Sequence, residues 1–312
     1  MTGAEFRTRI TDNIGKVIIG GEDTVLFLLT ALLADGHVLL EDVPGTGKTK
    51  AAKSLARSLD AEFRRIQFTP DLLPGDITGL NIYDQKQREF VLRRGPAFTN
   101  ILLADEINRA TPRTQSGLLE CMEERQITID GETYPAGTPF FVIATQNPVE
   151  TAGTFPLPEA QMDRFLMRLS MGLPEKAEEK RILERYMREE PLDALEPVVS
   201  LEELAIARDA VRQIYVHSCV LDYMVDIVAA TRQGEDVIMG VSPRGSLALL
   251  RCVKAYAWLQ GREFVTPDDV KALALPVLAH RIVRGYGHSG GGRELLEQIL
   301  ANTVVPTEDF RP

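Results

Sequence analysis

The sequence predicts an α/β domain with a parallel sheet between helices, followed by a smaller all-α domain. Up to about residue 171, short apolar runs alternate with segments of helical periodicity, as in a sheet whose strands are joined by helices. These runs contain few polar residues, which is typical of parallel strands buried on both faces. From residue 172 to 312, apolar residues recur at helical spacing. We therefore expect domains at 1–171 and 172–312.

The elements of the first domain follow from local patterns along the chain. Residues 1–34 are predicted to be helical, "HVLLEDV" a strand, and "KTKAAKSLARSLD" a helix rich in good helix formers. Further strands are expected at "EFRRIQFT", "NILLADE" and "PFFVIATQN", with a helix at "RTQSGLLECMEERQ". Two insertions, at about 70–96 and 125–139, are predicted hairpins, because turn residues lie between short strand-like pieces.

The second domain is predicted from five segments of helical periodicity. Several begin with a Ser, Thr or Asp cap, and Pro or Gly separates them. The glycine-rich stretch "GYGHSGGGRE", residues 285–294, is interpreted as a loop because no apolar strand leads into it.

Composition excludes several classes of protein. The formal net charge of -10 disfavours broad nucleic-acid binding. Cys121, Cys219 and Cys252 are far apart, which fits neither a disulfide framework nor a zinc site. The four histidines are scattered. No apolar run reaches the ~18 residues of a membrane helix, and the first residues lack an apolar signal region. We expect a cytoplasmic protein without a membrane span.

The stretch "VPGTGKT", between the first strand and its helix, is typical of a phosphate-binding loop. Its glycines allow close backbone approach, and the helix N-terminus supplies amides and a positive dipole. Lys48 would reach the β- and γ-phosphates, and the Thr49 hydroxyl suits Mg²⁺. The usual pattern has glycine where this chain has Asp42, whose carboxylate we expect to point away from the phosphates. The expected nucleotide contacts are Pro44, Gly45, Thr46, Gly47, Lys48, Thr49 and Lys50.

Downstream residues support an ATP site. Asp105 and Glu106 end the apolar run "ILLADE", and carboxyl ends of parallel strands gather where ligands bind. Asp105 would support the Mg²⁺ shell, and Glu106 would orient and deprotonate the attacking water. Asn147, at the end of "FVIATQN", would hold that water near the γ-phosphate.

Two arginines are further candidates. Arg164 in "LPEAQMDRF" is interpreted either as a surface arginine or as an arginine finger that reaches a neighbouring subunit's γ-phosphate. Arg244 lies in the first turn of a helix with Ser242 as N-cap and Pro243 at its first position. From there it would reach back to the phosphates.

Taken together, "VPGTGKT", "ILLADEINRA", "ATQNP", "LPEAQMDRF" and "GVSPRGS" resemble the AAA+ ATPases and, within them, the MoxR family. The resemblance covers roughly residues 5 to 305. It implies that Lys48 and Thr49 belong to Walker A, Asp105 and Glu106 to Walker B, Asn147 to sensor 1 and Arg244 to sensor 2. Arg164 is similar to the arginine finger. "VIIGGED" resembles the segment that packs on adenine, with Ile18, Ile19 and Gly20 as contacts and Gly21 in place of the family's usual glutamine.

The resemblance also implies an assembly. Members form a ring, usually a hexamer, in which a neighbour's arginine completes each site. They commonly work with proteins that carry a von Willebrand factor A domain, and they remodel or activate a client, sometimes by helping metal insertion. The two hairpins resemble elements that face the ring pore or a client.

Other functions stay open at this stage. A nucleic-acid motor is one, because Lys86, Arg88, Arg93 and Arg94 lie in the first insertion. A magnesium-chelatase-type ATPase subunit and a non-hydrolysing nucleotide-gated scaffold are the others. The preferred function is a Mg²⁺-dependent ATPase whose hydrolysis changes the conformation of a bound protein.

Overall fold

A five-stranded parallel sheet forms the centre of the first domain. The structure is a computed structural model that describes residues 1–148, 153–187, 190–234, 236–285 and 291–311. The strand order is β2-β5-β8-β1-β9, and every neighbouring pair is parallel. The strands are β1 (Val38–Glu41), β2 (Phe63–Gln67), β5 (Ile101–Asp105), β8 (Phe141–Gln146) and β9 (Met167–Leu169). The predicted fold class is confirmed, and β9 is a short strand that the sequence pattern did not indicate.

Alternate residues of each central strand enter different hydrophobic clusters. In β5, Ile101 and Leu103 pack on one face of the sheet, whereas Leu102 and Ala104 pack on the other. Both faces are therefore buried, which explains why these strands are continuous apolar runs. The helices α1 (Gly3–Gly15), α2 (Glu22–Leu33) and α3 (Lys48–Ser58) belong to the first cluster, and α5 (Pro112–Glu124) belongs to the second.

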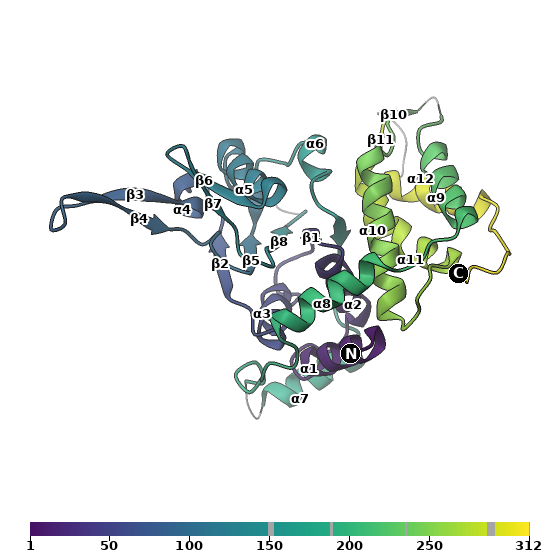
Figure 1. The fold of residues 1–312 in the computed structure, drawn as a ribbon, viewed down its shortest axis with the longest axis horizontal. Helices are drawn as coiled ribbons and strands as arrows, with labels where there is room; N and C mark the ends of the chain where they lie inside the picture. Colours follow the sequence, from purple (N-terminus) through teal and green to yellow (C-terminus); the bar gives the residue numbers. More distant parts are fainter. Residues whose placement is uncertain (149–152, 188–189, 235, 286–290, 312) are drawn as a thin grey trace.

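Two antiparallel hairpins extend from this core. The first contains a short helix, α4 (Pro74–Thr78), followed by β3 (Gly79–Asp84) and β4 (Glu89–Arg94). The second is β6 (Gln126–Ile129) with β7 (Glu132–Pro135). The β3–β4 hairpin projects far from the sheet, on the left in Figure 1. Its exposed apolar side chains are Leu80, Ile82, Tyr83, Phe90 and Val91.

The second domain is mainly helical. Its helices are α7 (Lys176–Tyr186), α8 (Leu201–Arg212), α9 (Ser218–Ala230), α10 (Pro243–Leu259), α11 (Pro267–Leu278) and α12 (Gly292–Asn302). A short antiparallel pair, β10 (Val237–Met239) and β11 (Val283–Arg284), corrects the expectation of helices alone. These strands are too short to show a periodicity in the sequence. Of the predicted loop at 285–294, residues 286–290 lie outside the described residues, and residues 292–294 belong to α12, which corrects the loop prediction there.

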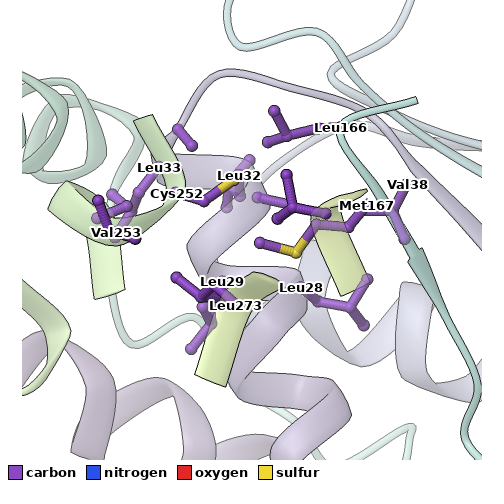
Figure 2. Packing of buried hydrophobic residues seen from close by; sticks show 14 of the residues in the cluster. Leu28, Leu29, Leu32, Leu33, Val38, Leu166, Met167, Cys252, Val253 and Leu273 are labelled. Carbon is purple, nitrogen blue, oxygen red and sulfur yellow. The ribbon is translucent and has the colours of Figure 1, made fainter. Parts of the chain in front are cut away.

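One hydrophobic core joins the two domains. The Phe6 ring of α1 meets Trp258 of α10 edge-on, with centroids 5.4 Å apart. Figure 2 shows Leu28 and Leu32 of α2, Val38 of β1 and Met167 of β9 gathered with residues of α10 and α11. The helical domain is thus packed against α1 and α2 by buried apolar surface.

Candidate active site

A tight turn connects β1 to α3 and carries the expected phosphate-binding residues. Gly45 and Gly47 have φ values of +90° and +88°, which residues with a Cβ rarely adopt. Lys48 begins α3, and its Nζ donates to the carbonyl of Asp42 over 2.8 Å. The backbone amides at the start of α3 are thereby presented at the carboxyl edge of the sheet.

This turn lines one cavity of about 480 Å³ together with the other predicted core residues. Because β5, β8 and β1 are neighbours in the sheet, their carboxyl ends bring residues from three distant segments together. The cavity is lined by all of the expected residues from 44 to 50, by Asp105, Glu106 and Asn147, and by Ile18, Ile19 and Gly20.

Thr145 holds the two acids in place, a role that sequence reasoning missed. Its hydroxyl donates to Asp105 Oδ1 over 2.6 Å and accepts from the Glu106 amide over 2.8 Å. Asp105 Oδ2 also pairs with Arg65 at 2.7 Å. Glu106 has a φ of +57°, an uncommon conformation for a residue with a side chain. The polar contact of Thr145 therefore fixes a backbone turn that aims both carboxylates at the cavity edge.

The Glu106 carboxylate is engaged by neighbouring polar side chains. Gln67 Nε2, at the end of β2, donates to Glu106 Oε2 over 2.6 Å, and Arg109 Nε lies 3.4 Å from the same oxygen. One oxygen of the Glu106 carboxylate is therefore occupied. Gln67 or Arg109 must be released before both oxygens can contact a water molecule.

The residues that line the cavity fit a magnesium ion. The Thr49 hydroxyl and the Asp105 carboxylate line the same cavity, and Mg²⁺ binds through few protein oxygens with phosphates and waters completing its shell. Among the described residues, no group of three or more His, Cys, Asp or Glu side chains forms a metal cluster. The donor set therefore suits a nucleotide-bound cation rather than an ion held by protein alone.

The structure places Arg164 and Arg244 outside this cavity. Arg164 Nε pairs with Glu123 Oε2 at 3.1 Å, and Arg244 contacts Oε1 of the same carboxylate. Arg244 also lies 3.9 Å from Asp163. Ser242 and Pro243 are the N-cap and the first residue of α10, as predicted. Arg244 is thus held at Glu123 of α5 and does not line the cavity, which corrects the expectation that it reaches back to the phosphates of its own chain.

One end of the cavity is made by residues that the sequence gave no reason to select. The segment after β9 and one face of α7 form its far end, with Met171, Gly172, Leu173, Pro174, Glu178, Ile182 and Tyr186. Lys50, expected at the phosphates, has its Nζ 3.8 Å from the centre of the Tyr186 ring and 3.1 Å from Glu190. Apolar residues opposite the phosphate loop suit the base of a nucleotide.

Comparisons with known proteins agree with this architecture. Residues 37–167 match the family of ATPases associated with various cellular activities, and residues 229–299 match the AAA lid domain. A crystal structure from Cytophaga hutchinsonii, described as a candidate ATPase, superposes with a TM-score of 0.90 at 36% identity, covering 98% of this chain and 97% of that one. Fold and site therefore define an AAA+ ATPase.

Curated relatives identify the family. The uncharacterized protein YeaC of Bacillus subtilis is 50% identical and covers 96% of this chain and 95% of its own. The chaperone MoxR1 of Mycobacterium tuberculosis is 42% identical over 97% of this chain and 82% of its own. MoxR of Paracoccus denitrificans is 34% identical, and the match covers 94% of this chain and 93% of that protein. The chain belongs to the MoxR family of AAA+ ATPases.

Proposed function

We propose that this protein is a Mg²⁺-dependent ATPase that uses hydrolysis to remodel or activate a partner protein in a chaperone-like manner. The observation that carries the ATPase part is the single cavity lined by Lys48, Thr49, Asp105, Glu106 and Asn147. The chaperone part is supported by the similarity to MoxR1, which is named a chaperone. Mg²⁺ bound at Thr49 and Asp105 would neutralise phosphate charge.

The contacts of the side chains suggest how they act. Lys48 exchanges the Asp42 carbonyl for phosphate oxygens, because a charged acceptor is the stronger partner of an ammonium group. Glu106 leaves Gln67 to orient and deprotonate the attacking water. Asn147 is buried at the end of β8 beside the cavity and holds that water near the γ-phosphate.

We infer that the protein works as a homo-oligomeric ring, a hexamer, in which Arg164 acts in trans. Arg164 and Arg244 share Glu123, and the three side chains are between 32% and 45% exposed. An incoming γ-phosphate from a neighbour would replace Glu123 as the partner of these arginines. The cluster is therefore suited to complete a site on another subunit, and both arginines stabilise its transferring phosphoryl group.

The proposed partners are a von Willebrand factor A domain protein and a client, whose activation includes metal-cofactor maturation. The protein acts in the cytoplasm, a compartment in which free thiols such as Cys121, Cys219 and Cys252 persist. No helix within the described ranges is long and apolar enough to cross a membrane. The exposed apolar side chains of the β3–β4 hairpin are suited to contact a client.

Replacing Glu106 by Gln tests this function. We expect Glu106→Gln to lower turnover about 100-fold while ATP binding is kept, since only the general base is lost. The ATP-loaded variant should retain a client that ADP releases, measured by pull-down and mass spectrometry. Glu124→Gln, which alters an exposed acid at the end of α5, is the control. If the parent protein bound ATP without hydrolysing it, a nucleotide-gated scaffold would replace the ATPase.

A second candidate function is a motor on nucleic acid. The β3–β4 hairpin combines the exposed cations Lys86, Arg88, Arg93 and Arg94 with exposed aromatic rings, a combination that suits stacking and phosphate contacts. Single- and double-stranded DNA should be added to the ATPase assay. A large stimulation by either would overturn the assignment of a protein client.

A further inference from the structure

Asp42 replaces a glycine of the usual phosphate-loop pattern, and its side chain forms a buried clamp. Oδ1 accepts hydrogen bonds from Ser170 Oγ over 2.6 Å and from the Gly172 amide over 3.1 Å. Oδ2 accepts one from the Met171 amide over 2.7 Å. The residue is 6% exposed and does not line the cavity, so its carboxylate points away from the phosphates, as expected.

The main chain of Asp42 is engaged at the same time. Its carbonyl accepts from Lys48 Nζ over 2.8 Å, and its amide donates to the Gln146 carbonyl at the end of β8. The backbone of Asp42 therefore contacts the phosphate loop, while its side chain contacts residues 170–172, so that one residue connects the two segments.

The clamped segment, residues 170–172, connects the sheet to the helical domain. It follows β9 and leads through Leu173 and Pro174 into α7. Met171 and Gly172 line the apolar end of the cavity themselves, together with a face of α7 and residues 18–20. Gly172 has a φ of +70°, so the chain turns sharply where the clamp holds it. We call the apolar end of the cavity the base end and the end lined by the phosphate loop the phosphate end. The clamp thus sets the position of the base end relative to the phosphate end.

The chemistry of the clamp requires a carboxylate. Three donors point at two oxygens, and an ionised Asp is an acceptor at both. In Asn, one oxygen is replaced by a donating NH₂ group, which would leave at least one amide of residues 171–172 without an acceptor. Glycine, the residue of the usual pattern, would keep the backbone contacts and lose all three bonds.

We propose that Asp42 is a positioning residue that fixes the base end of the nucleotide site to its phosphate end. ATP, which spans both ends, is thereby distinguished from a bare polyphosphate, which occupies only one. This proposal rests on the proposed function, because it takes ATP as the ligand of the cavity.

Titration calorimetry with ATP and with inorganic tripolyphosphate, both with Mg²⁺, tests the proposal. We expect Asp42→Ala to weaken ATP binding about tenfold, because charge-assisted hydrogen bonds are lost. Binding of tripolyphosphate should stay unchanged. Asp42→Asn should show the same selective loss. In the ATPase assay, KM for ATP should rise more than kcat falls. The control is Glu41→Gln, which changes a neighbouring acid that pairs with Arg168 of β9. It should leave the binding of both ligands unchanged.

The outcomes separate this proposal from the function on which it rests. If the folded parent bound neither ligand, the proposed function would fail. If the parent bound both and Asp42→Ala weakened them equally, Asp42 would serve the phosphate loop alone, and the clamp would be refuted. Unchanged binding of both ligands would refute it as well. Should Asp42→Ala fail to fold, Ser170→Ala removes one of the three bonds and must show the same selective, smaller loss of ATP affinity.

Discussion

The two ends of the cavity are built in different ways. The phosphate end consists of one tight turn and the carboxyl ends of three neighbouring strands. The base end brings together residues 18–20, the segment after β9 and a face of α7, which are far apart in the sequence. Phosphate recognition by backbone amides needs a local conformation, whereas recognition of a base needs contacts between separate segments. The arginine cluster on Glu123 is a third region, outside both ends.

Replacing Arg164 should give the largest effect and shows whether the phosphate end is complete within one chain. We expect Arg164→Ala to lower turnover about 1,000-fold with ATP binding intact, because an arginine finger stabilises charge only in the transition state. Mixing this variant with Lys48→Ala subunits should restore part of the activity, measured as phosphate release. Arg168→Ala, an arginine paired with Glu41, is the matched control. No recovery in mixed rings would contradict action in trans.

The phosphate end could be predicted from the sequence because local rules determine it. Gly45 and Gly47 are needed for positive φ, and Asp105 and Glu106 end an apolar strand. The base end could be predicted only in part. Residues 18–20 were expected from the family resemblance and line the cavity, whereas Met171 and Tyr186 carry no local signal and depend on where the segment after β9 and α7 pack. Arg244 was expected at the phosphates from its place in α10. In the structure Arg244 instead pairs with Glu123 of α5, an ion pair between distant segments that no local pattern encodes.

Acid should destabilise the sheet that supports the phosphate end. His37 lies buried just before β1, where Nδ1 accepts from the Val142 amide and Nε2 lies 2.9 Å from the Met122 carbonyl. Burial lowers the pKa of His37 to about 4, below its unfolded value of 6.5. The stability due to neutral His37 is complete above pH 6.5 and is lost as the pH falls towards 4.

We expect the free energy of unfolding to fall by about 3 kcal/mol between pH 6.5 and pH 4 from this group. Denaturant titrations at several pH values over this range measure the slope of the free energy of unfolding against pH. His37→Gln, which keeps a donor and an acceptor without titrating, should flatten it. The remaining slope includes His280, because burial lowers its pKa as well. An equal slope in parent and variant would show that His37 is not held neutral by the fold.

The smallest expected effect concerns the base end alone. Tyr186 lines that end, and its ring also contacts Lys50 Nζ. Tyr186→Ala should weaken ATP about tenfold by removing an aromatic face for the base, with tripolyphosphate binding unchanged. Tyr186→Phe keeps the ring and should bind ATP like the parent. Because turnover at saturating ATP depends on the phosphate end, kcat should hold in both variants. A fall in kcat with unchanged ATP affinity would mean that α7 acts on the chemistry, and the separation between the two ends would not stand.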